Sequence, residues 1–122
     1  MEEILAGAAE LGRRIAASDV FARLRRSESA IQADEAARKL LNDFQAQRLR
    51  VDELESSGKP VEVEDKHRIR DLADAVHSHP KLQELLRAQA DYLEMMGRVN
   101  RTIQGELSKM DGEEASAPAK EE

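Results

Sequence analysis

The stretch that decides the fold is Pro80–Met110, which reads PKLQELLRAQADYLEMMGRVNRTIQGELSKM. Its apolar residues recur every three or four positions, which is the period of one face of an α-helix and not of a β-strand. They are Leu82, Leu85, Leu86, Tyr92, Leu93, Met96, Val99, Ile103, Leu107 and Met110. Proline suits the first turn of a helix, where its missing N–H costs no hydrogen bond. The stretch therefore predicts one amphipathic helix roughly 46 Å long, which exceeds the width of a small compact domain.

A narrower stripe within this helix follows the heptad pattern of coiled coils, whose positions a and d are apolar. These positions hold Leu86, Leu93, Met96, Ile103, Leu107 and Met110, with Gln89 at one d and Asn100 at one a. A polar residue at an a position often fixes the register and the number of helices that associate. The apolar stripe is longer than the rest of the chain can cover, so we predict at least a dimer. The predicted interface residues are Leu86, Leu93, Met96, Asn100, Ile103 and Leu107.

The amino-acid composition limits the fold classes and the kinds of reactive site that this chain can form. The chain has 122 residues, of which 40% are hydrophobic and 36% are charged, and its aromatic residues are Phe21, Phe44 and Tyr92. Such a composition is typical of a helical or coiled-coil protein and disfavours a strand-rich one. The chain has no cysteine, which excludes disulfides, thiolate metal sites and cysteine catalysis. No apolar run of membrane-spanning length and no secretory leader is present, so we expect a cytoplasmic protein without a membrane partner.

Shorter helical patterns precede the long helix. We predict helices over residues 3–16, from Ser18 to about 31, 35–56 and 61–78, with Ser18 and Asp34 as N-caps. A turn is expected at Ser56–Pro60, where glycine suits a helix C-terminus and proline stops the helix. The expected fold is therefore an all-α antiparallel bundle of four to five helices. A helical domain over 1–110 would be followed by a disordered acidic tail over 111–122.

The N-terminal half carries a group of arginines in an otherwise acidic chain of net charge −6. These are Arg13, Arg14, Arg23, Arg25 and Arg26. The guanidinium group pairs with carboxylates through two parallel hydrogen bonds, so we predict that these residues bind an acidic protein partner. An RNA-binding module is the alternative, although no aromatic or glycine-rich element interleaves with the arginines. The overall acidity also argues against wrapping of nucleic acid, which depends on many basic contacts to phosphate.

One cluster invites a metal interpretation. His67, Asp71 and Asp74 are spaced for one helix face, with His77 and His79 just beyond. Imidazoles and carboxylates at this spacing bind zinc in some proteins, but a solvated charged face is the more common arrangement. The sequence shows no HExxH spacing and no phosphate-binding loop. We therefore predict no catalytic, cofactor-binding or metal-binding residues, no bound cofactor and no enzymatic activity.

Several short segments occur together in an order that identifies a family resemblance. They are Ala9–Ser18 (AELGRRIAAS) followed by Phe21, Ala33–Ala36 (ADEA), Leu40–Gln45 (LLNDFQ), Gly58–Pro60 (GKP), Pro80–Leu82 (PKL) and Val99–Ile103 (VNRTI). In this order the chain resembles the YlbF/YmcA family over about residues 3–110. These small bacterial helical proteins act in competence, sporulation and biofilm control.

The resemblance implies a non-enzymatic regulator that associates with itself or with paralogues. It also implies an influence on messenger-RNA processing through ribonuclease Y. Cluster binding within that family requires cysteines, and this chain has none. Any cluster that this protein meets would have to take its ligands from another subunit. A purely structural assembly protein is a further alternative to the regulatory adaptor.

Overall fold

The protein is built from α-helices, as predicted. A computed structural model describes the backbone of residues 1–116 and the side chains of residues 1–112. The helices are α1 Glu2–Ala16, α2 Asp19–Gln32, α3 Glu35–Ser56, α4 Val63–Ser78 and α5 Pro80–Ser116. No strand occurs within residues 1–116. None of the helices in this part of the chain combines the length and the apolar character needed to cross a membrane.

The helix boundaries follow local signals in the sequence. The hydroxyl oxygen of Ser18 accepts a hydrogen bond from the Phe21 N–H at 3.2 Å, and the Asp34 carboxylate accepts one from the Ala37 N–H at 3.0 Å. Both are N-caps at the expected positions. Gly58 ends the α3 turn with φ +73°, a left-handed conformation that glycine adopts without strain. Pro80 opens α5, where no N–H is needed.

The C-terminal end of α5 lies further along the chain than the sequence pattern indicated. The helix continues past Met110 to Ser116. Residues 111–116 were expected to begin a disordered tail, but they include glutamate and alanine, which are good helix formers. The remainder of that expected tail, residues 117–122, lies outside the described residues.

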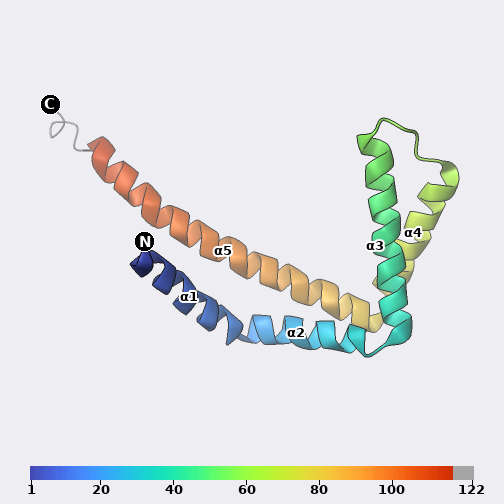
Figure 1. Ribbon diagram of the computed structural model, residues 1–122, viewed down its shortest axis with the longest axis horizontal. Coiled ribbons are helices and arrows are strands. Elements are labelled where there is room, and N and C mark those ends of the chain that lie inside the picture. Colours follow the sequence, from blue (N-terminus) through green and yellow to red (C-terminus); the bar gives the residue numbers. More distant parts are fainter. Residues whose placement is uncertain (117–122) are drawn as a thin grey trace.

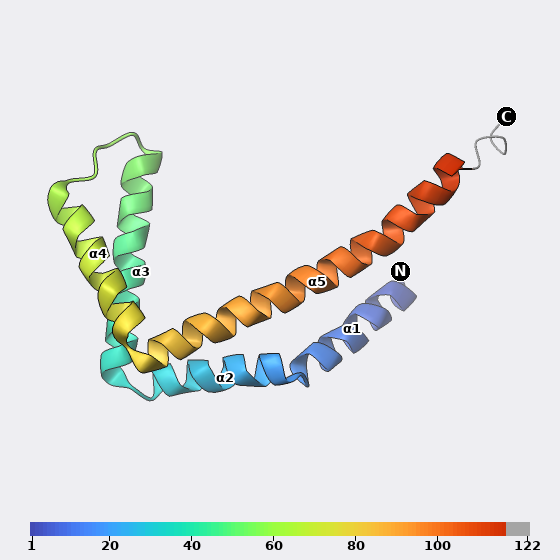
Figure 2. The ribbon, with the colours of Figure 1, turned by 180° about the vertical axis from the view of Figure 1, so that it is seen from behind.

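The helices form two arms that meet at an elbow, as Figure 1 shows. In the long arm, α1 and α2 run antiparallel to α5, and in the short arm α3 and α4 form an antiparallel hairpin. The view from behind shows the same angle between the arms (Figure 2). The turn at Ser56–Pro60 gives an antiparallel helix pair, as predicted, but the long helix runs back along α2 and not along α4, where it was expected, and the helices do not surround one central axis (Figures 1 and 2). The break at His79 and Pro80 and the tight turn at Ala33–Asp34 redirect the chain at the elbow.

The buried core lies at the elbow. It consists of Leu24, Ile31, Ala37, Val76, Leu82, Leu85 and Ala88, with Leu40, Leu41, Phe44, Leu86 and Tyr92 packed against it. Leu82 and Val76 are each only 1% exposed. Ala37 and Ala88 are fully buried, and their small side chains let neighbouring helices approach closely. The core thus fixes the elbow, and no side chain from the distal parts of α1 and α5 belongs to it among residues 1–112.

Ion pairs strengthen the contacts between helices. The Arg23 guanidinium on α2 donates to both Glu84 oxygens at 2.7 and 2.8 Å and to Asp91 at 2.5 Å, which fastens α2 to α5. Hydrogen bonding to Arg23 lowers the pKa of Glu84, and the same contact raises the pKa of Arg23. In the short arm, Arg50 on α3 donates to Asp65 on α4 at 3.0 Å and lowers the pKa of that carboxyl.

Candidate partner-binding face

The distal half of α5 carries a stripe of apolar side chains that the rest of the chain leaves open. Leu93 is 68% exposed, Ile103 45%, Leu107 55% and Met110 57%. Burying such side chains against another apolar surface contributes a favourable free energy of about 25 cal/mol per Å² of apolar surface removed from water. Among the other predicted interface residues, Leu86 and Met96 are half-buried and Asn100 is exposed. We refer to the heptad positions Leu86, Gln89, Leu93, Met96, Asn100, Ile103, Leu107 and Met110 as the α5 stripe.

The stripe remains open because α2 covers a neighbouring flank of α5. Arg23 contacts Glu84 and Asp91, and the Phe21 ring lies 6.0 Å from the Tyr92 ring, measured between centroids. At 100° per residue, Tyr92 lies beside the a and d positions, whereas Glu84 and Asp91, both at f positions of the heptad, lie on the opposite side of α5. One helix therefore has two apolar flanks, and the chain itself uses only one of them along its distal half.

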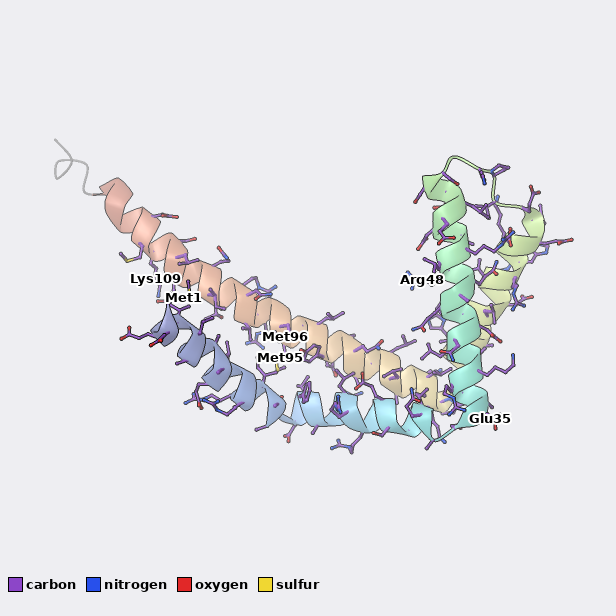
Figure 3. The ribbon with its side chains drawn as sticks, in the orientation of Figure 1. Met1, Glu35, Arg48, Met95, Met96 and Lys109 are labelled. Atoms are coloured by element: carbon purple, nitrogen blue, oxygen red, sulfur yellow. The ribbon has the colours of Figure 1, made fainter. Side chains whose placement is uncertain are left out.

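A groove separates α1 from α5. It has a volume of about 620 Å³ and is lined by Leu11, Val20, Asp91, Glu94, Met95, Arg98, Val99, Thr102 and Ile103. In Figure 3, Met95 lies on the edge of α5 that faces α1 and α2. No residue of α1 is buried, and its apolar Ile4 and Leu5 are 70% and 59% exposed. The distal long arm thus holds two helices whose apolar sides are incompletely covered.

At its other end the stripe reaches the inner corner of the elbow. A small pocket of about 120 Å³ is lined there by Leu41, Phe44, Gln45, Arg48, Val76, Leu82, Leu85, Leu86 and Gln89. The guanidinium carbon of Arg48 lies 5.8 Å from the centre of the Phe44 ring, within range of a cation–π contact. Figure 3 shows Arg48 on the side of α3 that faces the inside of the angle between the arms. This corner was not predicted, although Phe44 and Arg48 are spaced four apart on one helix face.

The five predicted partner-binding arginines differ in their contacts within the chain. Arg13 and Arg14 both pair with Glu10, at 2.8 and 3.4 Å. Arg23 is held between α2 and α5 by Glu84 and Asp91, so its guanidinium serves an intramolecular contact. Arg25 and Arg26 are exposed, and no ion pair involves them within the described part of the chain. The seven-residue spacing of Glu84 and Asp91 is the sequence signal that could have revealed the Arg23 contact.

The histidine and aspartate cluster on α4 does not form a metal site in the described structure. No group of three His, Cys, Asp or Glu side chains among residues 1–112 is arranged to hold a metal ion. His67, Asp71, Asp74 and His77 are all exposed, and His79 is half-buried at the elbow. The His77 ring Nδ1 lies 2.7 Å from the Ala73 carbonyl oxygen, so this imidazole already has a local backbone partner.

Comparison with known proteins identifies the family. The sequence profile described as control of competence regulator ComK, YlbF/YmcA, matches residues 4–108. The chain belongs to the YlbF/YmcA family. A UPF0342 protein of Desulfitobacterium hafniense is 33% identical over 98 residues, which cover 80% of this chain and 75% of that protein. A UPF0342 protein of Bacillus cereus is 26% identical over 101 residues, covering 83% and 86% of the two chains.

Two solved structures share the fold of this YlbF/YmcA protein. One is a protein of unknown function (DUF964) from Bacillus stearothermophilus, with a TM-score of 0.76, 19% identity, and coverage of 89% of this chain and 96% of that one. The other is Bacillus subtilis RicA in complex with RicF, with a TM-score of 0.73, 19% identity, and coverage of 88% and 96%. At this level of identity the likeness concerns the fold.

Proposed function

We propose that this protein is a non-enzymatic regulatory adaptor whose α5 stripe docks a helix of another protein chain. The observation that carries this proposal is the open stripe itself, with Leu93, Ile103, Leu107 and Met110 each 45% exposed or more on the same side of one helix. Contiguous exposed apolar surface on a soluble protein marks an interaction site. A helix face with this spacing accepts the apolar face of a second helix.

The comparisons support association within the family. The family is described by its control of a competence regulator, and RicA was solved in complex with RicF, so protein partners have a precedent on this fold. The expected partners are a further copy of this chain or a paralogous family member. We further propose that such complexes modulate ribonuclease Y-dependent messenger-RNA processing, as the family resemblance implies.

Titration of the purified chain with each paralogue encoded by its host tests the docking role. Isothermal titration calorimetry should show saturable binding of at least one paralogue to the unchanged chain. If the chain binds itself instead, diluting a concentrated sample should give a heat of dissociation. Leu107→Asp should abolish it, because it places a charge in an apolar contact. Ser108→Asp is the matched control, since it adds the same charge at the next residue, away from the stripe. Equal binding by both variants would mean that the α5 stripe is not the docking surface.

The ribonuclease step needs a separate readout. In a host strain that lacks this chain, expression of the unchanged protein should restore the cleavage pattern of ribonuclease Y substrates, as seen on northern blots. The Leu107→Asp variant should fail to restore it, and Ser108→Asp should succeed. Unaltered transcripts in the deletion strain would leave the chain as an assembly protein without this regulatory task.

Direct RNA binding is the alternative that rests on the N-terminal arginines. Arg13, Arg14 and Arg23 already pair with carboxylates of the same chain, which leaves less positive charge for phosphate. A titration of labelled RNA at about 50 and 200 mM salt distinguishes the two functions. Phosphate-driven binding weakens steeply over this range, by orders of magnitude for a site with many contacts. Tight, salt-sensitive binding would favour the RNA module.

The arginines divide into two groups with different expected effects on mutation. Reversing Arg25 and Arg26 to Glu should leave the melting temperature nearly unchanged, because both side chains are exposed. The same change should weaken the binding of any acidic partner that uses this side of α2. Arg23→Glu should instead lower the melting temperature, because it brings a third carboxylate to Glu84 and Asp91. Thermal melts by circular dichroism check both outcomes. Equal melting temperatures for the two variants would contradict the structural role of Arg23.

A further inference from the structure

We infer that the occupant of the α5 stripe is a second copy of this chain, with its α5 running antiparallel to the first. The inference rests on the proposed docking role of the stripe and identifies the partner and its direction. It follows from three properties of the described residues. These are the order of the heptad positions, the charges beside them, and the angle between the two arms.

The stripe is complementary to itself when one copy is reversed. Antiparallel coiled helices place an a residue of one chain beside a d residue of the other. A two-fold axis near Arg98 then pairs Leu93 with Ile103, and Leu86 with Met110, across the interface. Asn100 meets Met96, so the two asparagines lie about one helical turn apart on either side of the axis, close enough to set the register. Gln89 meets Leu107 at each end.

The residues beside the stripe disfavour the parallel alternative. In a parallel pair, the g residue Glu106 of one chain would face the following e residue Asp111 of the other, and like charges at this spacing repel. In the antiparallel pair, Glu106 faces Tyr92 instead. On the two flanks at the axis, Gly97 meets Gly97 and Val99 meets Val99 of the second copy. No pair of like charges is produced along the described length of α5.

The shape of the molecule supports the same direction. Two parallel copies would bring both α3–α4 arms to the same end of the pair, where they would compete for space (Figure 1). In an antiparallel pair, the distal halves of the two α5 helices lie side by side. The C-terminal end of each α5 then reaches the inner corner of the other copy's elbow. Each short arm then closes one end of the pair, and the same surface of both copies is used, as in an isologous dimer.

The inner corner is suited to receive that end of α5. Its pocket is lined by Leu41, Phe44 and Leu86, apolar partners for the exposed Met110 of the second copy. Arg48 stands at the rim of the corner above Phe44. In the antiparallel register the exposed Asp111 of the second copy approaches this guanidinium, so an acidic helix end meets a basic corner. Opposite charges at both ends of the interface favour this direction of approach.

Single cysteines test the inference directly, because the chain has none of its own. One batch carries Leu93→Cys and a differently sized batch, made with a fusion tag, carries Ile103→Cys. Each batch alone, and an equal mixture after subunit exchange, is treated with a bismaleimide that spans about 8 Å. In the antiparallel pair, residues 93 and 103 of opposite copies lie at the same level. Identical residues lie about 15 Å apart along the axis, at 1.5 Å per residue.

The expected result is a cross-linked product that joins the two batches in the mixture and little product from either batch alone. Ser108→Cys, on the outer side of α5, should give none. Product from each batch alone and none that joins the two would mean a parallel pair, which overturns the inference. Circular dichroism on each variant verifies that the fold is retained.

Sedimentation separates failure of this inference from failure of the proposed function. The unchanged chain should sediment as a dimer at micromolar concentration. A monomer that gives no cross-linked product overturns the second-copy partner. If that monomer still binds a paralogue and Leu107→Asp abolishes the binding, the docking role stands with a different occupant. If it binds neither a paralogue nor itself, both proposals fail.

Discussion

Leu82→Ala is expected to destabilise the fold by about 2–5 kcal/mol, the range for removing a large aliphatic side chain from a well-packed core. Leu82 is 1% exposed and belongs to the cluster that joins the two arms at the elbow. Few other apolar side chains share the loss, because the buried apolar residues of the described chain all belong to this one cluster. Thermal unfolding followed by circular dichroism should show a melting temperature lower by roughly 10 °C for a chain of this length.

Leu49→Ala is the matched control, since it makes the same chemical change on a residue that is 60% exposed on α3. Surface substitutions of this kind change stability by about 0.5 kcal/mol or less. A Leu82→Ala protein that melts together with the Leu49→Ala protein would mean that the elbow is not the main core. The fold would then have to be held along the arms instead.

The helices themselves were predictable because the signals for them are local. Three-to-four periodicity, the caps at Ser18 and Asp34, the turn before Pro60 and the break at Pro80 each depend on a few neighbouring residues. The structure confirms these boundaries to within a few residues, apart from the further length of α5. The family resemblance is confirmed by the match over residues 4–108.

The arrangement of the helices was less predictable, because periodicity gives a face and not its neighbour. The width of the α5 apolar surface indicated two uses, but nothing local indicates that α2 takes the flank with Tyr92 and leaves Leu93 open. Arg23 illustrates the same limit. It was predicted as a partner-binding residue, yet its carboxylate partners Glu84 and Asp91 lie on a helix more than sixty positions away in sequence.

The inner corner of the elbow was unpredictable for the same reason. Its pocket brings together residues of α3, α4 and α5, three segments whose meeting depends on the turn at Ala33–Asp34 and the break at His79. The sequence contained the Phe44 and Arg48 spacing but no sign that Leu86 and Gln89 would lie beside it. The corner links the stripe to the short arm, so the angle of the elbow contributes to partner choice as well as to shape.

The introduced charge with the clearest meaning for function is Leu93→Asp. Leu93 is 68% exposed in the single chain, so an aspartate there remains solvated and should leave helicity and the melting temperature of the monomer almost unchanged. In the associated state the same carboxylate would be buried between two apolar surfaces without a partner. Burial of an unpaired charge costs several kcal/mol, and about 3 kcal/mol already weakens the dissociation constant more than 100-fold.

Sedimentation equilibrium across a concentration series measures this effect, and circular dichroism on the same samples measures the fold. Ile103→Asp should behave like Leu93→Asp, because the two residues pack together across the antiparallel interface and either carboxylate spoils the same contact. Combining both substitutions should then add little to either one, since residues that share one contact are not independent. Fully additive losses would place Leu93 and Ile103 in separate contacts and would contradict the antiparallel register. A Leu93→Asp chain that associates as tightly as the unchanged protein would exclude the stripe as the interface.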